Sequence, residues 1–184
     1  DLHSEALAAT ERVVALRREV GDPDQLAVAL GLLGYARFRA GQDDKVAAPV
    51  AEALATVEHR PDSLAKARTY VQAAMIGMFQ RRYRQAVAAS KKALELSRRL
   101  GDERLEARTL VALGAAEIVM GDARRAVGIL REARALAERV GAADVARLAV
   151  WMLGTGAGEA RLYDEAEAAL ATLVAAAVDT DDDS

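Results

Sequence analysis

The sequence lacks cysteine altogether, has only three prolines, and only 4% of its 184 residues are aromatic. Without cysteine there is no disulfide framework and no thiolate metal site. The net charge of −3 supplies no basic field for nucleic acid. No apolar run approaches the roughly 18 residues of a membrane span, and the N-terminus does not resemble a signal peptide. These absences favour a cytoplasmic protein.

Helix-forming residues fill the rest of the chain, whereas runs of β-branched residues are scarce. Between short breaker segments such as "GDPD" and "GDER", apolar residues recur at three- and four-residue spacing. Asp22, Asp62 and Asp102 suit helix N-termini, and Gly21, Gly101 and Gly141 suit C-termini. The pattern predicts an all-α fold with helices near residues 3–20, 23–40, 43–59, 62–80, 83–100, 102–120, 123–140, 143–158 and 163–178.

Three sets of positions repeat every forty residues without any insertion. One contains turn residues, and two contain small residues within helices. A small residue in a helix allows a second helix to approach closely, so each repeat is predicted to be a pair of antiparallel helices. One pair cannot bury both of its faces, and stacking supplies the core. The sets are Gly21, Pro61, Gly101 and Gly141; Gly34, Ala74, Gly114 and Gly154; and Ala6, Val46, Ala86, Ala126 and Ala166.

The predicted array therefore begins in the middle of a repeat. Helix 3–20 aligns with the second helix of a repeat whose first helix is absent, and four full repeats follow at about 23–60, 62–100, 102–140 and 143–178. We expect residues 1–178 to form one solenoid and the acidic residues 179–184 to be disordered. Uncapped ends would meet neighbouring domains of a longer protein or associate in a homodimer.

The repeat resembles the tetratricopeptide family, whose signature runs W-x₂-L-G-x₂-Y and then A-x₃-F. The third repeat shows it best, with Leu110, Leu113, Gly114, Ala126 and Leu130. The resemblance covers residues 26–175 and implies a right-handed α-solenoid of about four and a half repeats. It also places Tyr83 and Tyr163 beneath the turns within repeats. The family's motif tyrosine is replaced, by Arg37, Gly77, Glu117 and Ala157.

The repeat is longer than the usual 34 residues, and HEAT and armadillo repeats are the alternative at this length. The Leu-Gly positions favour the tetratricopeptide interpretation. Long repeats joined by "LGD"-type turns resemble those of kinesin light chains and of large bacterial regulators of the LuxR and MalT type. The second resemblance implies a sensor or regulatory arm of a multidomain bacterial transcriptional or signalling regulator.

The stretch "GTGAGEA" at 154–160 contains three glycines but is not predicted to bind phosphate. A phosphate loop needs a preceding strand, and a P-loop also needs Lys-Ser/Thr after its last glycine, where this chain has Glu159 and Ala160. Gly154 instead aligns with the close-packing glycines of the other repeats. The extra Gly156 and Gly158 should weaken the helix, which leaves a kink or a ligand space beside Trp151 as alternatives.

The family resemblance also implies a concave groove lined by the first helices of the repeats. An apolar groove rimmed by arginines suits a peptide or helix with an acidic end. The alternative is that these residues pack on a neighbouring domain or on each other. The Lys/Asn pattern of chaperone-tail binders is absent. The candidate groove residues are Tyr35, Phe38, Arg39, Arg68, Met75, Met78, Phe79, Arg108, Trp151 and Thr155.

Catalytic and metal chemistry find no support in the sequence. His3 and His59 lie in different repeats, and no cofactor motif is present. Basic clusters alternate with acidic residues and have no aromatic stacking platform, so direct binding of nucleic acid is not expected. The sequence therefore predicts a non-enzymatic scaffold for a protein or peptide partner. The alternative is a small-molecule sensor pocket lined by Trp151, Met75 and Phe79.

Overall fold

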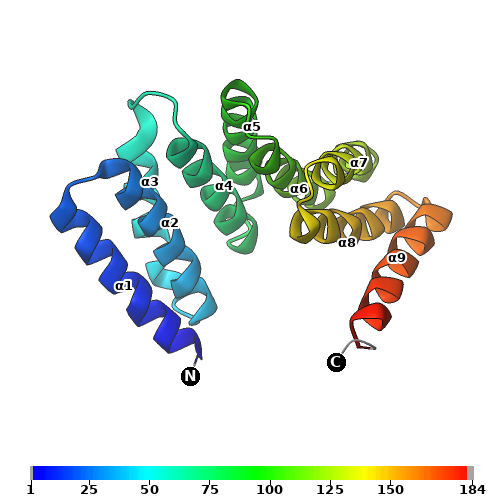
Figure 1. The fold of residues 1–184 in the computed structure, drawn as a ribbon, viewed down its shortest axis with the longest axis horizontal. Helices are drawn as coiled ribbons and strands as arrows, with labels where there is room; N and C mark the ends of the chain where they lie inside the picture. The colour runs from blue at the N-terminus through cyan, green and yellow to red at the C-terminus, as the bar shows by residue number, and fades with distance from the viewer. Residues whose placement is uncertain (1, 182–184) are drawn as a thin grey trace. The chain divides into compact units, whose positions relative to one another are not determined.

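The computed structural model describes residues 2–181, with side chains from residue 2 to residue 175 (Figure 1). The predicted all-α class is confirmed, because this range holds nine α-helices, one short 3₁₀ turn and no strand. Of residues 179–184, which were predicted to be disordered, 179–181 form the end of the last helix and 182–184 lie outside the described part. The elements are α1 Leu2–Val20, α2 Pro23–Arg39, η1 Asp43–Lys45, α3 Ala47–Glu58, α4 Leu64–Phe79, α5 Tyr83–Leu100, α6 Glu103–Val119, α7 Ala123–Arg139, α8 Ala143–Glu159 and α9 Tyr163–Asp181.

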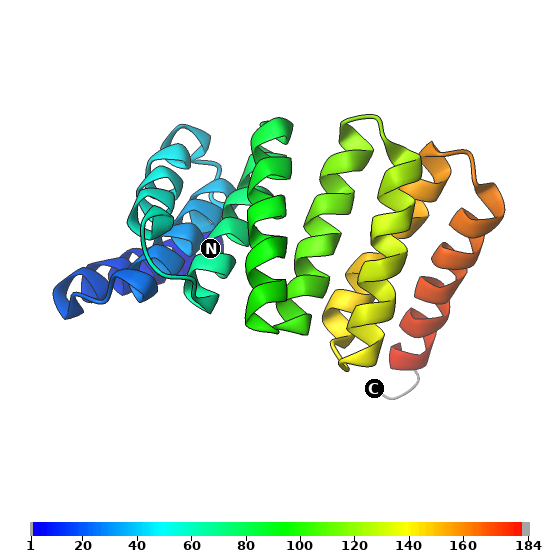
Figure 2. The ribbon, with the colours of Figure 1, turned by 90° about the horizontal axis from the view of Figure 1, so that it is seen from above.

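The helices pack as consecutive hairpins in two compact units, Asp1–Leu100 and Gly101–Ser184 (Figure 2). In the first unit α2 packs against α1, α3 and α4, and α4 pairs with α5. In the second unit α6 pairs with α7, and α8 packs against α6, α7 and α9. Each unit thus buries the apolar sides of its helices by stacking one hairpin on its neighbour, as a repeat fold requires.

Side chains at most of the predicted positions cap the helices. Asp22 accepts hydrogen bonds from the backbone N–H groups of Asp24 and Gln25, and Asp102 accepts one from Leu105. Such caps satisfy donors that have no partner within the helix. The prediction for Asp62 is wrong, because the side chain of Ser63 accepts from the N–H of Lys66 and caps α4 instead.

Most turns within and between repeats use a left-handed residue at the helix end, whereas the α3–α4 turn with Pro61 has none. The predicted Gly21, Gly101 and Gly141 are confirmed, with φ of +76°, +68° and +67°. Within repeats the same conformation is adopted by Gly41 and Gly121, and by Arg81 and Arg161 at φ of +58° and +61°. A side chain is disfavoured there because its Cβ approaches the following carbonyl. The two arginines therefore occupy a conformation that favours glycine.

Arg161→Gly should raise the free energy of unfolding by about 0.5–1 kcal/mol. The substitution removes the left-handed penalty of about 1–2 kcal/mol, partly offset by the greater freedom of glycine in the unfolded chain. Urea denaturation followed by circular dichroism measures this change. Gly121→Ala, at the equivalent turn of the preceding repeat, should change stability in the opposite direction. Destabilisation by Arg161→Gly would contradict the interpretation.

Helix α3 begins four residues later than predicted, at Ala47 rather than 43, after the 3₁₀ turn Asp43–Lys45. Pro49 explains the difference, because proline has no N–H to donate to the carbonyl of Lys45 and its ring clashes with that carbonyl in a continuous helix. A guanidinium supplies the missing donor: Nη1 of Arg37 donates to the Lys45 carbonyl at 3.1 Å. Arg37, which replaces the motif tyrosine, thus gives the Lys45 carbonyl a hydrogen-bond donor at the start of α3.

The forty-residue glycine positions do not all have the same packing. A Cβ built on Gly114 would lie 2.6 Å from Cγ of Leu130, and one built on Gly34 would lie 2.7 Å from Cγ2 of Val50. At Gly154 the nearest atoms belong to Leu170 at 3.4 Å, an ordinary contact. The close-packing role predicted for all three therefore holds for the first two and is weaker at Gly154.

Gly156 proves to be a packing position rather than a ligand space. A Cβ there would lie 3.1 Å from Cδ1 of Ile118 in α6, and the residue is buried. Gly158 meets nothing within 4 Å. Another prediction that fails is the placement of Tyr163 beneath a turn, because its side chain is 67% exposed. Helix α8 continues without interruption across both glycines.

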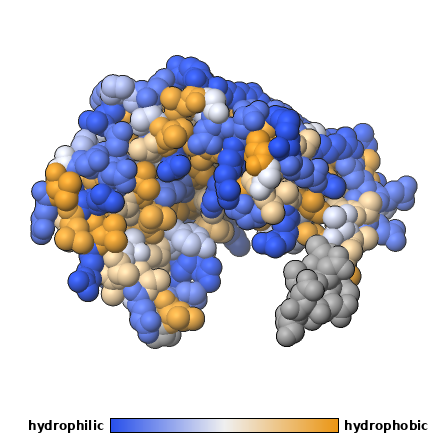
Figure 3. Space-filling view, viewed as in Figure 1, coloured by the Kyte–Doolittle hydropathy of each residue, from blue (hydrophilic) through white to orange (hydrophobic). Residues whose placement is uncertain are grey.

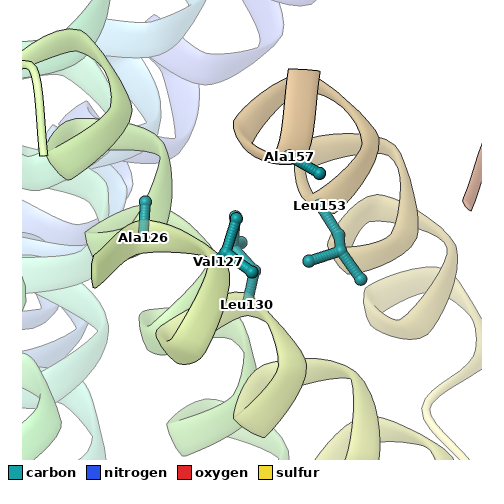
Figure 4. Close-up of a cluster of buried hydrophobic side chains, with 5 residues drawn as sticks. All are labelled: Ala126, Val127, Leu130, Leu153 and Ala157. Atoms are coloured by element: carbon teal, nitrogen blue, oxygen red, sulfur yellow. The ribbon is translucent and has the colours of Figure 1, made fainter. Parts of the chain in front are cut away.

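The core of the second unit lies between α7 and α8 (Figure 4). Ala126, Val127 and Leu130 from α7 meet Leu153 and Ala157 from α8, and Leu130 is completely buried. Small residues at 126 and 157 let the helices approach while the larger side chains fill the space between them. Ala157 stands at a motif tyrosine position, so this site is used for close helix packing.

Candidate functional site

Three of the seven aromatic residues gather on the first unit. Phe38 from α2 stacks on Phe79 from α4, with ring centroids 4.6 Å apart and planes 6° from parallel. Tyr35, one turn before Phe38, lies 6.0 Å from Phe79 in a tilted arrangement. Phe79 remains 43% exposed. The cluster thus presents an open aromatic face rather than a closed core.

Arg39 extends this cluster with a positive charge. Its guanidinium carbon lies 6.0 Å from the centroid of the Tyr35 ring, and its Nη1 donates to the tyrosine hydroxyl at 3.1 Å. Its Nη2 is 3.5 Å from Nε2 of His3 in α1. The cation-π and hydrogen-bond contacts hold the side chain at the edge of the aromatic face.

A hollow of about 280 Å³ opens beside the stacked rings, and we name it the aromatic hollow. Its sides come from the ends of α2 and α4 and from the turns that follow them. Gln80 bridges the two turns, because its Nε2 donates to the backbone carbonyl of Asp43 at 3.4 Å. The lining residues are Phe38, Asp43, Phe79, Gln80, Arg81 and Arg82.

Positive charge predominates around the aromatic hollow. Among the described residues, Arg39, Arg81 and Arg82 take part in no ion pair, although many other arginines do, such as Arg60 with Asp24 at 2.6 Å. Asp43 is the one carboxylate in the lining. Exposed cations beside an apolar surface attract an anionic group and hold it through charge-assisted hydrogen bonds.

The ten predicted groove residues divide between the two units. Arg68, Met75 and Met78 lie on α4 with Phe79; Arg68 is exposed, and the methionines are half-buried. In the second unit Arg108 lies on α6, and Trp151 and Thr155 lie on α8. Trp151 is 54% exposed, whereas the Thr155 hydroxyl donates to the Trp151 carbonyl. None of the ten is buried, and the structure brings together Tyr35, Phe38, Arg39 and Phe79.

The sequence did not indicate four residues of the hollow, Asp43, Gln80, Arg81 and Arg82. They lie in turns, outside the helical positions that the family resemblance marks as groove. A signal existed at Arg81, since the equivalent positions forty residues away on either side are glycines. An arginine at a left-handed position indicates that its side chain is retained at some cost.

A second hollow of about 170 Å³ lies behind the α4–α5 turn, between α3, α4 and α5. Its floor is apolar and includes Val50, Leu54 and Ile76, and its edge carries Gln80 and Arg82, which also line the aromatic hollow. Its volume is close to that of a cavity that accepts a benzene ring. The α4–α5 turn therefore separates two neighbouring concave surfaces of different character.

In the described residues no three or more histidine, aspartate or glutamate side chains group in a way that could hold a metal ion. Nor does any helix in residues 2–181 have both the length and the apolar character needed to cross a bilayer.

Comparison with known families finds a match in the middle of the chain. Residues 65–139, from α4 to the end of α7, match a tetratricopeptide repeat model. This segment, less than half of the chain, is similar to tetratricopeptide repeats. Comparison with curated proteins found no significant sequence match. The resemblance to this family is confirmed for residues 65–139, whereas the resemblance to regulators of the LuxR or MalT type stays a prediction.

Solved structures with similar folds align over nearly the whole of this chain. BtubC (BKLC) from P. vanneervenii aligns over 98% of this chain and 93% of its own, with 17% identity and a TM-score of 0.64. A putative kinesin light chain protein with nearly identical TPR-like repeats, from Podosopora anserina, aligns over 97% and 88%, with 15% identity and a TM-score of 0.74. Aspartyl phosphate phosphatase F from Bacillus subtilis aligns over 94% of this chain but 45% of its own, with 14% identity and a TM-score of 0.75. At these identities the likeness establishes the fold alone.

Proposed function

We propose that this tetratricopeptide repeat chain is a non-catalytic scaffold that binds an acidic peptide segment at the aromatic hollow. One observation carries the proposal: the Phe38–Phe79 stack, whose Phe79 ring is exposed, lies beside Arg81 and Arg82, which have no carboxylate partner among the described residues. Tetratricopeptide repeat domains generally bind proteins or peptides, so the fold is consistent with such a role.

The chemistry of the hollow defines the features of its peptide. An apolar or aromatic side chain would cover Phe79 and remove its exposed ring from water, which contributes roughly 25 cal/mol per Å² of apolar surface buried. An adjacent carboxylate would accept hydrogen bonds from Arg81 or Arg82. Asp43 would repel a carboxylate on its own side, so the acidic residue should lie toward the arginines.

The wider context is proposed on the basis of the long repeats alone. Their resemblance to the arrays of LuxR- and MalT-type proteins supports a sensor or regulatory arm of a multidomain bacterial regulator, in which peptide binding would report the presence of a partner. A ligand that binds one arrangement of the repeats more tightly than another shifts the population between them. Neighbouring domains of such a regulator would be further partners.

A small-molecule sensor is the second candidate, and the apolar hollow of about 170 Å³ behind the α4–α5 turn favours it. Arg82 at the edge of that hollow would pair with an anionic group on a ligand the size of one aromatic ring. This site differs from the one that the sequence indicated, because none of Trp151, Met75 and Phe79 lines it.

Selection of random peptides displayed on phage against the full chain tests the proposal. We expect enriched peptides to pair an apolar or aromatic residue with a nearby Asp or Glu, and we expect their affinity to fall as salt screens the arginines. Benzoate, an anion built on one aromatic ring, tests the second candidate. That candidate predicts that benzoate binds at Arg82 and that a competing ligand displaces it from there. Enrichment of basic or uncharged peptides, or salt-independent binding, would contradict the peptide proposal.

A further inference from the structure

A third hollow lies in the first unit, at the connection between α3 and α4. Its volume is about 370 Å³, at the lower end of the range for small-molecule sites. Figure 3 shows mainly hydrophilic surface over this connection and the end of α5. None of its lining residues belongs to the aromatic hollow or to the apolar hollow behind the α4–α5 turn. We name it the charged hollow; its lining includes Glu58, Lys66, Tyr70, Lys92, Leu96 and Arg99.

Tyr70 distinguishes this repeat from the others. The residues at the same position in the other repeats, Leu30, Leu110 and Val150, are aliphatic and buried. Tyr70 is 7% exposed, and its hydroxyl reaches solvent without a hydrogen-bond partner in the described part of the chain. Nζ of Lys92 lies 5.2 Å from the centroid of its ring. The second repeat therefore places a free hydroxyl and an ammonium together where the other repeats have only aliphatic core.

Most of the charges around the hollow already have partners. Nζ of Lys66 donates to two backbone carbonyls near the end of α3, at 2.8 and 3.1 Å. The guanidinium of Arg99 pairs with two carboxylates of the lining, at 2.9 and 3.7 Å. By contrast, the carboxylate of Glu58 and the ammonium of Lys92 have no ion-pair partner among residues 2–175. The hollow thus carries one unpaired negative and one unpaired positive charge.

The first repeat shows that a pair can form at these two positions. Arg18 and Glu52 precede Glu58 and Lys92 by forty residues, and they pair between α1 and α3 at 2.7 Å. In the second repeat the signs are exchanged, but Glu58 and Lys92 do not pair, and Lys92 lies over the Tyr70 ring instead. Two opposite charges that stay apart at the edge of an open hollow suit a ligand that carries both signs.

We propose that the charged hollow binds a small zwitterion, namely a free α-amino acid. The carboxylate of the ligand would accept hydrogen bonds from the Lys92 ammonium and the Tyr70 hydroxyl, and its ammonium would donate to Glu58. The lining has as many acidic as basic side chains, so it offers no net charge that would favour a simple anion or cation. A ligand with both charges satisfies Glu58 and Lys92 together.

Titration of the full chain with L-alanine, followed by nuclear magnetic resonance, tests the proposal. L-alanine is a sufficient probe because the proposed contacts are made by groups that every α-amino acid has. We expect saturable shifts of resonances from Tyr70 and Lys92. Propionate is alanine without its ammonium, and ethylamine is alanine without its carboxylate. Each lacks one of the two sets of contacts, so each should bind about three- to tenfold more weakly.

Three conservative variants locate the ligand. Tyr70→Phe removes the hydroxyl and keeps the ring, so it should weaken L-alanine binding by about three- to tenfold. Lys92→Gln and Glu58→Gln should each have a similar effect. Lys91→Gln is the control, because Lys91 precedes Lys92 on α5 but lies outside the lining, and it should leave binding unchanged. Thermal midpoints from circular dichroism should show that every variant folds.

The proposal is overturned if L-alanine gives no saturable shifts, or if propionate or ethylamine binds as tightly. Unchanged L-alanine affinity in Tyr70→Phe, Glu58→Gln and Lys92→Gln would also overturn it, because the amino acid would then bind elsewhere. Affinity for the selected acidic peptides should be the same in all these variants, since none of the substituted residues lines the aromatic hollow. Failure of amino-acid binding would therefore leave the peptide proposal intact.

Discussion

Leu130→Ala is expected to lower the free energy of unfolding by about 3–4 kcal/mol, since truncating a buried leucine costs 2–5 kcal/mol where the site cannot collapse. Leu130 is completely buried between α7 and α8, and it also fills the space left by the missing side chain of Gly114 in α6. Its loss therefore leaves a cavity shared by three helices. Urea denaturation followed by circular dichroism measures the change.

The same side chain decides the effect of a neighbouring substitution. Gly114→Ala would place a Cβ 2.6 Å from Cγ of the completely buried Leu130, so we expect a net loss of about 1–2 kcal/mol despite alanine's better helix propensity. In the Leu130→Ala background the conflict disappears, and Gly114→Ala should become neutral or stabilising. This difference is the coupling energy of a double-mutant cycle.

Gly154→Ala is the matched control, because its nearest neighbour atoms lie at 3.4 Å. We expect it to stabilise the chain by up to about 1 kcal/mol through helix propensity alone. Equal losses at Gly114 and Gly154 would show that the forty-residue glycines have one common role, contrary to the contacts found for Leu130 and Leu170.

Much of this fold could be predicted from the sequence because the same pattern of turn residues and small residues recurs in each repeat. Glycines at 21, 101 and 141 marked helix ends correctly, since a left-handed residue there is a local requirement. Local patterns were less informative where one residue competes with another. Ser63 displaced Asp62 as a cap, and Pro49 delayed α3 although the surrounding residues favour helix. How closely Gly154 and Gly156 are packed depends on side chains of other helices. The spacing of residues along the sequence does not indicate these contacts.

The candidate site was likewise predictable only in part. Tyr35, Phe38 and Phe79 could be assigned to one surface because the family resemblance fixes which helix positions share a face. Their mutual stacking depends on how α2 and α4 pack, and it appeared only in the structure. Arg81 and Arg82 were missed because turn residues have no helical periodicity, so their direction follows from the backbone of the turn itself.

Phe79→Ala should weaken binding of the selected acidic peptides by tenfold or more, because a central aromatic anchor contributes about 2 kcal/mol or more at an interface. The side chain is 43% exposed, so its removal should cost the fold less than removal of a core residue. Isothermal titration calorimetry measures the affinity, and urea denaturation measures the stability. Trp151→Ala, on the second unit, is the control and should leave peptide affinity unchanged. Collapse of the fold on Phe79→Ala would instead assign the ring to the core.

Arg81→Gly should separate binding from stability, since the two effects have opposite signs. Removing a side chain from a left-handed position stabilises the fold by about 0.5–1 kcal/mol, whereas losing the guanidinium removes a charge-assisted hydrogen bond to the peptide, worth about 1.5–3 kcal/mol. We therefore expect a higher urea midpoint together with at least tenfold weaker peptide binding. Arg161→Gly makes the same backbone change at the α8–α9 turn and should raise stability alone. If Arg81→Gly stabilised the chain and left peptide affinity intact, the arginine would have no part in recognition, and the strain at this turn would be incidental to function.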